Sequence, residues 1–395
     1  MTATPSPAPL GGRLVTPFTA VLAGFVVVMI GVLAVRFAHG LGAVTNLNNG
    51  YPWGIWIIYD VVIGTALGAS GFMVAFLTYI VNRGAYHPLV RPALLTALFG
   101  YVMAGASVVF DVGRYWNAYH LFMPRYMQRN SVLFEVALCI SAYTIVLIVE
   151  FLPAVLERIG LAGARRKLER LLFVFVALGV LLPTMHQSSL GSLLIVFGPQ
   201  IDPIYQTRLL PVLFLSSTVG MGLAAVVLEA SVSSLALRRP IEYPLLARLM
   251  TIGRVVTAVF LVVRFADLAV RGALPRVFEP RLVGGMFWIE IALFALPLAL
   301  GFGEAGRGPR RVFVSAMAMA FAGALYRIDA YYVAYATGPG WHYFPSLGEL
   351  AVTIGLIAFE VLLFLVAVRL LPVLPRAQVR EPGDQPWASA SSSTR

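Results

Sequence analysis

The segment VFDVGRYWNAYH, residues 109–120, places an acid and a base three residues apart directly after an apolar stretch. Asp111 can exchange a proton, and Arg114 can stabilise negative charge on an oxygen atom. The aromatic rings of Tyr115 and Trp116 can pack against a flat molecule, and His186, in LPTMHQSSLGS, offers a further donor. Side chains of these types suit the binding of a flat, polar molecule that gains or loses protons.

Further ionisable groups occur inside segments that are otherwise apolar. A charged side chain at a bilayer centre costs about 2.5–3.5 kcal/mol on insertion scales, so such residues usually face a cavity or a partner. Asp60, Glu135 and Glu229 are carboxyl groups of this kind, and His186 stands at the end of a predicted span. Glu229 falls nearer one predicted face of the membrane and the others nearer the opposite face. This distribution predicts a proton-exchanging site near one face that is supplied from the other.

Some buried charges have a purely structural alternative. Arg264 and Asp267 are three residues apart, and Arg327 and Asp329 follow each other near a predicted helix end. Each pair is a candidate for an ion pair that neutralises charge within the membrane and has no other role.

The elements that must position these residues are predicted to be membrane-spanning helices. The 395 residues are 59% hydrophobic and only 12% charged, with a mean hydropathy of +0.84, and apolar runs of about 20 residues recur throughout. The sequence therefore predicts an all-α integral membrane protein. We expect a tail at 1–16, a transmembrane domain at 17–371 and a disordered tail at 372–395, with ten spans at 17–38, 53–81, 89–110, 132–157, 169–187, 208–237, 248–270, 284–302, 311–333 and 347–371.

The basic residues predict the orientation of the chain. A net charge of +11 can indicate nucleic-acid binding, but here the cations cluster in loops between apolar runs. The loops on the N-terminal side hold more than twice as many Lys and Arg residues as the opposite loops. The positive-inside rule therefore places both termini in the cytoplasm and residues 111–116 at the outer face.

The sequence also limits the cofactors that the chain can hold. The single Cys139 excludes a Cys-ligated iron–sulfur cluster, and we expect no metal site. Three of the five histidines are predicted in loops, and His39 and His186 at the outer ends of spans, so no pair lies at matching depth well inside the membrane as axial ligands for haem. The pair His39 and His186 remains geometrically possible at this point. A quinone, whose carbonyl groups need donors and whose ring needs apolar walls, fits the outer site better.

The turn DVGR after an apolar helix resembles the mark of the NrfD/PsrC family of quinone-interacting membrane subunits. The chain is most similar to the HybB-like membrane subunits of hydrogenase-2-type NiFe hydrogenases. The similar stretches extend over nearly the whole chain and are GLGAVTNLNNGYPWGIWIIYD, NRGAYHPLVRPALL, DVGRYWN, NSVLFE, LLPTMHQSSLGSL, MFWIE, YFPSLGEL and RLLPVLP. One departure is Tyr115, where many shorter members have proline.

The resemblance implies an NrfD-like helical bundle in the bacterial inner membrane. It implies a quinone-reactive anchor subunit that exchanges electrons with a periplasmic ferredoxin-like iron–sulfur subunit, beyond which lie the small and large subunits of a NiFe hydrogenase. The chain itself would not react with H₂. Its substrate would be menaquinone or ubiquinone, and its role in anaerobic respiration would include proton translocation. The resemblance carries quinone and proton roles over to Asp60, Asp111, Arg114, Glu135, His186 and Glu229.

Other functions remain open at this point. The chain could serve another respiratory oxidoreductase, such as a molybdenum enzyme or a supercomplex. It could be a proton-coupled secondary transporter, although a transporter would place its polar residues near the membrane midplane. A passive anchor is a third possibility, although an anchor has no need of so many ionisable groups. The sequence does not determine the quinone type, the direction of electron flow, whether protons are pumped or the oligomeric state.

Overall fold

The computed structural model describes residues 7–81, 84–237, 239, 243–301, 306 and 308–374. All long regular elements in this part of the chain are helices, and ten of them are long and apolar enough to span a membrane. The predicted all-α membrane fold with ten spans is therefore confirmed. The predicted disordered tail falls almost entirely outside the described residues.

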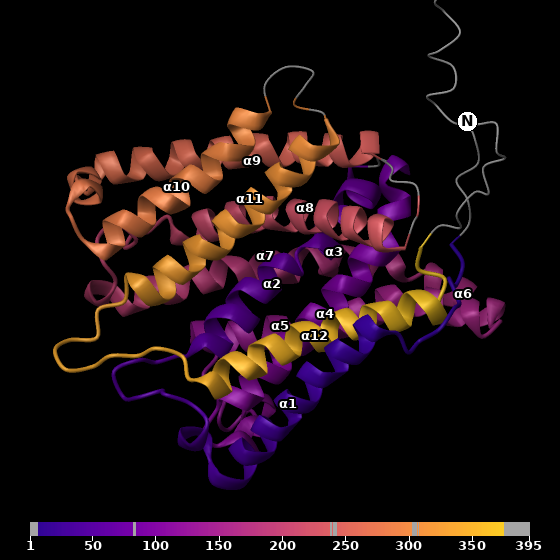
Figure 1. The fold of residues 1–395 in the computed structure, drawn as a ribbon, viewed down its shortest axis with the longest axis horizontal. Coiled ribbons are helices and arrows are strands. Elements are labelled where there is room, and N and C mark those ends of the chain that lie inside the picture. The colour runs from indigo at the N-terminus through magenta and orange to yellow at the C-terminus, as the bar shows by residue number, and fades with distance from the viewer. Residues whose placement is uncertain are drawn as a thin grey trace, which may run out of the picture.

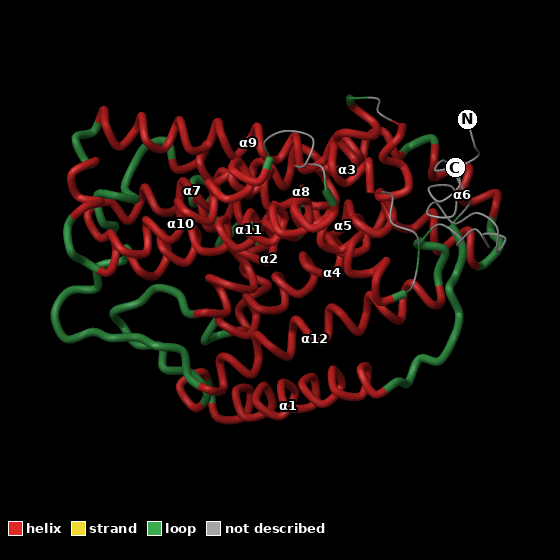
Figure 2. Tube along the Cα trace, turned by 45° about the horizontal axis from the view of Figure 1, so that its top comes forward, coloured by secondary structure: helices red, strands yellow, loops and turns green. Residues whose placement is uncertain are grey.

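The helices are arranged as two groups flanked by a peripheral pair. The first group holds span two (Trp56–Ile80), α4 (His87–Asp111), α5 (Val132–Arg158) and α7 (Leu172–Phe197). The second holds α8 (Leu210–Ala236), α9 (Tyr243–Val270), α10 (Leu282–Leu300) and α11 (Pro309–Ile328), which is extended by the π-helical turn η9 (Asp329–Val333). Helix α1 (Pro17–His39) packs along α12 (Leu347–Leu370) at the opposite edge from α9 (Figure 1; Figure 2).

Successive spans run in opposite directions, so the loops gather at two ends of the molecule. We call the end with residues 112–131 the DVGR end; it also holds the loops 198–209 and 334–346. The other end, with residues 7–16 and 371–374, is called the terminal end and includes the short helix α6 (Ala162–Glu169). The structure contains no membrane, so the predicted cytoplasmic side of the terminal end stays a prediction.

Span two departs from regular α-helix. It is π-helical at Trp56–Ile63, α-helical in the short segments α2 (Gly64–Leu67) and α3 (Ser70–Ala75), and π-helical again at Phe76–Ile80. A π-helical turn leaves backbone groups without their usual partners and is common at functional sites. Gly68 and Gly71 allow close contact with Tyr101 and Ala97 of α4, as expected for small residues at a helix seam.

The predicted end of span five is wrong by about ten residues. Helix α7 continues from Leu172 to Phe197 through the sequence QSSLGSLLIVF, most of which lies beyond the predicted end at residue 187. The hydroxyls of Ser189 and Ser192 donate to the carbonyls of Met185 and Ser188 within the helix, which makes serine compatible with an apolar environment. As a result His186 lies near the middle of α7 and not at its outer end.

Glycines on α8 give a direct test of this packing. A methyl group at Gly222 would lie 2.9 Å from the backbone of Ala69 in span two, whereas one at Gly220 would come no closer than 3.4 Å to a methionine side chain. Overpacking costs about 1–3 kcal/mol, and alanine regains up to about 1 kcal/mol of helix propensity. Gly222→Ala is therefore expected to lower the melting temperature in detergent by about 1–2 °C. Gly220→Ala should leave it unchanged or raise it, and equal effects of the two substitutions would contradict the packing.

Candidate functional site

Arg36 of α1 holds the DVGR turn in place. Its guanidinium is 1% exposed and donates to the backbone carbonyls of Phe110 at 2.7 Å and Val112 at 2.6 Å, on either side of Asp111. The same group stacks on Tyr115, 5.2 Å from the ring centroid. Asp111 is the last residue of α4 and half-buried, and one of its carboxyl oxygens is buried without a hydrogen-bond partner in the described part of the chain.

The remaining residues of the turn face outward. Arg114 is exposed, as is Trp116, at 60%. Tyr115 is half-buried between Arg36 and Phe37, whose ring lies 4.8 Å from its own. Within the described residues, Asp111 and Arg114 form no ion pair with each other. The turn therefore presents a guanidinium and an indole beside a carboxyl group with an unused acceptor.

Asp60 lies below this turn, inside the bundle. It is 8% exposed, and the hydroxyl of Thr353 on α12 donates to its carboxylate at 3.4 Å. Ser107, one helical turn before Asp111 on α4, lies beside the same carboxyl. Further along the same face of α4, the carboxyl of Glu360 approaches to 3.6 Å from the position of a methyl group on Gly100. Three carboxyl groups thus follow one face of α4, from its end towards the membrane centre.

His186 is fully buried and belongs to a separate network at the membrane centre. Its Nε2 lies 3.0 Å from the hydroxyl of Thr65 in span two, which also accepts a hydrogen bond from Gln187 at 2.9 Å. Its ring lies 6.0 Å from that of Tyr101, which in turn packs edge-on against Tyr143 at 4.6 Å. No described contact joins His186 to Asp111 or Arg114.

Arg327 connects this network to the second helix group. It is fully buried, and its Nε donates to the carbonyl of Val62, which lies in the π-helical part of span two, at 3.1 Å. Its Nη2 donates to Thr218 at 2.6 Å, and Thr218 donates to Gln187 at 2.8 Å. The predicted alternative of an ion pair with Asp329 is not found among the described contacts. Instead, polar groups from four different spans satisfy this guanidinium.

The other predicted ion pair is also wrong. Arg264 lies 3.4 Å from Glu290 of α10, not beside Asp267. Asp267 pairs with Arg271 one turn later, at 2.7 Å. Pairing between helices could not be deduced from spacing along one helix.

Glu135 and Glu150 lie towards opposite ends of α5. Glu135 is half-buried in the first turn of the helix, at the DVGR end. Tyr143, on the buried face, lies two turns further on, and Glu150 follows after another two turns. Glu150 is buried against Gly179 of α7, and one of its oxygens has no partner in the described part of the chain.

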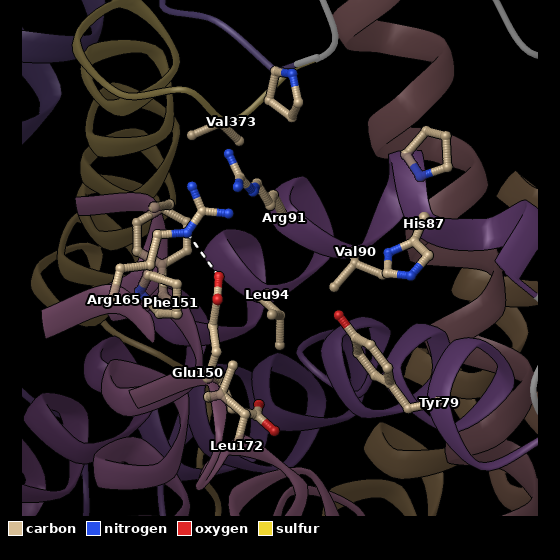
Figure 3. A pocket seen from close by; sticks show the side chains of 15 residues that line it. Tyr79, His87, Val90, Arg91, Leu94, Glu150, Phe151, Arg165, Leu172 and Val373 are labelled. Carbon is tan, nitrogen blue, oxygen red and sulfur yellow. Dashed lines mark hydrogen bonds and ion pairs between the residues drawn. The ribbon is translucent and has the colours of Figure 1, made fainter. Parts of the chain in front are cut away.

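Glu150 lines a cleft of about 360 Å³ at the terminal end. Figure 3 shows Arg91 and Arg165 on one side of this cleft, and His87 and Tyr79 on the other. At the mouth Arg91 pairs with Glu157 at 2.7 Å, and Arg165 with Glu157 and Glu169 at 3.1 and 2.7 Å. The hydrogen bond to Glu169 raises the pKa of Arg165, which stays cationic. The cleft thus leads from a charged surface to a buried carboxyl.

Glu229 stands apart from the other predicted proton carriers. It lies in the terminal half of α8 and is half-buried, with one carboxyl oxygen unpaired in the described part of the chain. The structure thus brings Asp60 and Asp111 together at the DVGR end and places Glu135 near the same end of the bundle. It separates these residues from His186 at the centre and from Glu229 towards the terminal end.

Three important residues were missed as site residues from the sequence. Arg36 supports the DVGR turn, Glu150 lines the cleft at the terminal end and Glu360 lies against the same face of α4 as Asp60. In the sequence only their position inside apolar segments distinguished them. That signal was available, but sequence could not show which helices these side chains face.

The histidines do not fit a haem site. His39 is exposed at the end of α1, and His87, His120 and His342 lie at a helix start or in loops. His186 is the one histidine buried at the membrane centre, and its Nε2 is engaged by Thr65. All five histidines fall within the described residues, and no two of them offer axial ligands at matching depth.

Comparisons with known proteins agree on one family. The model of the family "Polysulphide reductase, NrfD" matches residues 43–337. The chain is 40% identical, over 93% of its length and 95% of the relative's, to a protein of Escherichia coli named probable Ni/Fe-hydrogenase 2 b-type cytochrome subunit. It is 26% identical, over 86% of its length and 87% of the relative's, to the integral membrane subunit of a menaquinone reductase from Nitratidesulfovibrio vulgaris. The predicted family is confirmed, and the chain belongs to the NrfD family of multi-span membrane subunits.

Proposed function

We propose that this chain is the quinone-reactive membrane subunit of a periplasm-facing NiFe hydrogenase complex in the bacterial inner membrane. The carrying observation is the DVGR turn, where a partly buried carboxyl with an unused oxygen stands beside an exposed guanidinium and an exposed indole. Relatives named as a hydrogenase-2 subunit and as a menaquinone reductase subunit support a quinone substrate.

In this proposal the quinone head group binds at the DVGR end. Arg114 stabilises negative charge on a quinone oxygen, and Trp116 and Tyr115 provide apolar contact with the ring. Asp111 accepts or donates the proton, and Arg36 acts as a positioning residue because it fixes the backbone on both sides of Asp111. Electrons come from, or pass to, a ferredoxin-like iron–sulfur subunit that docks on this end, with the hydrogenase small and large subunits beyond it.

Protons are exchanged between the quinone site and the interior of the bundle. Asp60 is the nearest interior carboxyl, and Glu360 extends its path along α4 towards the centre. From the terminal end, the cleft reaches Glu150, and Tyr143 lies two turns away towards Tyr101 and His186. Glu135 lies at the DVGR end of α5, the helix that also holds Tyr143 and Glu150. Glu229, on α8, is a separate proton carrier from the terminal end. The DVGR end then faces the periplasm, as the distribution of Lys and Arg predicts.

The family supports a second candidate, in which the same site serves a different oxidoreductase. The observation in its favour is a relative from Mesobacillus selenatarsenatis that is named as part of a selenate reductase, although the match covers only 27% of this chain at 26% identity. Co-purification separates the two candidates. Hydrogenase subunits and H₂ oxidation should be recovered with the tagged chain, and recovery of a molybdenum enzyme would overturn the hydrogenase assignment.

The quinone site is tested by replacing its exposed guanidinium. In the purified complex, Arg114→Gln is expected to raise the apparent KM for quinone about tenfold or more, since a hydrogen bond from a charged group contributes about 1.5–3 kcal/mol. Reduction of an artificial dye, which takes electrons before they reach this chain, should stay normal. Arg129→Gln makes the same charge change on an exposed arginine of the same loop and serves as the control. An unchanged KM in Arg114→Gln would remove Arg114 from the site.

A further inference from the structure

The second helix group contains a buried polar cluster that the quinone site does not use. Its members are Arg264 of α9, Glu290 of α10, Asp329 of η9 and Tyr205 of the loop 198–209. All four side chains are at most 1% exposed. The cluster lies within the predicted membrane, about two helical turns from the DVGR end, and no described contact joins it to the residues assigned above to quinone binding.

Tyr205 reaches this depth because its loop folds back into the bundle. Arg271 donates to the carbonyls of Pro203 and Gln206, both at 2.8 Å. Asp202 accepts a hydrogen bond from Arg281 at 2.8 Å, and its backbone amide donates to the carbonyl of Ala334 at 2.8 Å. Irregular backbone can lie at membrane depth only when such partners satisfy it. The loop therefore closes the second helix group from the DVGR end.

The hydrogen bonds of Tyr205 limit the number of protons in the cluster. Its hydroxyl lies 2.7 Å from Glu290 and 3.2 Å from Asp329, so one oxygen contacts two carboxyl groups. A phenol is neutral near pH 7, and burial disfavours the charged phenolate further, so the hydroxyl of Tyr205 keeps its proton. A hydroxyl has one hydrogen and can donate to one carboxyl only. For both contacts to be hydrogen bonds, the other carboxyl must carry a proton and donate to Tyr205.

The net charge of the cluster also indicates that Glu290 and Asp329 share one proton. Arg264 is the cation of the cluster, 3.4 Å from Glu290 and 4.6 Å from the ring centre of Tyr205. Two ionised carboxylates would leave one negative charge uncompensated in a dry environment, which is strongly unfavourable. One proton shared by Glu290 and Asp329 leaves the cluster neutral. Tyr326 is a neutral phenol, and Asp267 pairs with Arg271. Arg327 is a second buried cation, but its hydrogen bonds go to neutral groups and no described contact joins it to Glu290 or Asp329, so Arg264 remains the cation in contact with the cluster.

Several atoms in the cluster form no hydrogen bond within the described chain. Nε of Arg264 and Oε1 of Glu290 face each other as an ion pair at 3.4 Å without forming a hydrogen bond. One oxygen of Asp329, Nη2 of Arg264 and the hydroxyl of Tyr326 have no hydrogen-bond partner either. Buried polar atoms are normally paired, so unpaired atoms that converge on one place point to a missing water or proton. A cluster built only to hold helices together would have no reason to leave them unpaired.

We infer that Glu290, Tyr205 and Asp329 form a one-proton binding site, separate from the quinone site, in which Tyr205 relays the proton between the two carboxyl groups. In one state Asp329 is protonated and donates to Tyr205, whose own hydrogen points to Glu290. Transfer of both hydrogens along this line leaves Glu290 protonated, Asp329 ionised and Tyr205 again neutral. The number of protons is conserved, and no charged tyrosine is formed.

Infrared difference spectroscopy of the purified full-length chain, together with any subunits that co-purify, tests this site without turnover. The carboxylic-acid C=O band that shifts in D₂O is compared between wild type and variants. In Glu290→Gln and in Asp329→Asn, the remaining carboxylate is balanced by Arg264 and needs no proton. Each single variant should therefore lose the absorbance of one acid, and the double variant should lose no more than either single one. Asp267→Asn, which removes an already paired carboxylate, should lose none.

Tyr205→Phe separates the relay from a simple buried acid. Without the bridging hydroxyl, the protonated carboxyl should remain but its C=O band should shift, because its hydrogen-bond partner is gone. A double variant that loses twice the absorbance of each single variant would overturn the shared proton, and so would single variants that lose none. An unshifted band in Tyr205→Phe would overturn the relay. Because these readouts need no quinone, failure of the proposed quinone site would leave them unchanged.

Discussion

Arg327→Met is expected to destabilise the chain by about 3 kcal/mol, which would place it among the most damaging single substitutions. The guanidinium of Arg327 is fully buried and donates to the carbonyls of Val62, Gly323 and Phe214 and to the hydroxyl of Thr218. Methionine can fill the volume but removes the donor to the carbonyl of Val62 and to the hydroxyl of Thr218, whereas the carbonyls of Gly323 and Phe214 keep donors within their own helices. Each unsatisfied buried group costs about 1–3 kcal/mol, partly offset because a buried charge is removed.

Thermal unfolding in detergent measures the effect, and the same helix offers a control. Arg310, at the start of α11, is exposed, so Arg310→Met should change the stability by less than about 0.5 kcal/mol. The stability of the Arg327→Lys variant should fall between those of Arg327→Met and Arg310→Met, because an ammonium keeps the charge but cannot reach the same acceptors. If the Arg327→Met and Arg310→Met variants have the same melting temperature, the guanidinium of Arg327 does not hold the two helix groups together.

Asp60→Asn is expected to lower the rate of quinone reduction at saturating quinone by about a hundredfold or more. Asp60 is the buried carboxyl below the DVGR turn, and an amide of the same shape cannot carry the proton. Asp111 can act in repeated turnovers only if Asp60 passes its proton on, so the loss of this step should cost as much as the loss of the general acid–base group itself, about 10²- to 10⁴-fold. Since Asp60 lies inside the bundle and does not contact the quinone in our proposal, the KM for quinone should change little.

The experiment compares H₂-driven quinone reduction with dye reduction in the same purified complex. Dye reduction should be normal, which shows that the complex is assembled and that electrons reach the iron–sulfur partner. Glu279→Gln removes an exposed carboxyl at the same end of the molecule and should leave both reactions unchanged. Quinone reduction at the wild-type rate in Asp60→Asn would exclude Asp60 from proton transfer.

The helices were predictable because the membrane makes their signal strong. Long apolar runs must be helical in lipid, and each of the ten predicted spans is a helix in the structure. Span five ends later than predicted because Ser189 and Ser192 satisfy their hydroxyls within the helix, which hydropathy alone does not show. The π-helical turns of span two also have no clear signal in sequence, since they depend on contacts with other helices.

The sequence indicated which kinds of residue make up the candidate site, but not which of them lie next to each other. Ionisable residues inside apolar runs indicated a functional interior, and Asp60 and Asp111 do lie near each other at the DVGR end. His186 was assigned to the quinone site because its span was predicted to end beside it. Partners between helices, such as Arg36 with the DVGR turn or Tyr205 with Glu290 and Asp329, depend on packing that no spacing along a single helix encodes.

The location of the quinone is the central claim, and photo-crosslinking measures it most directly. A photoreactive quinone is added to the purified complex, and the labelled peptides are identified by mass spectrometry, with unlabelled quinone as competitor. We expect competed labels in residues 109–122, which hold the DVGR turn and its aromatic residues. Competed labels confined to the terminal cleft, on segments that hold Tyr79, Glu150 and Leu172, would contradict the account and move the quinone to the opposite end of the bundle.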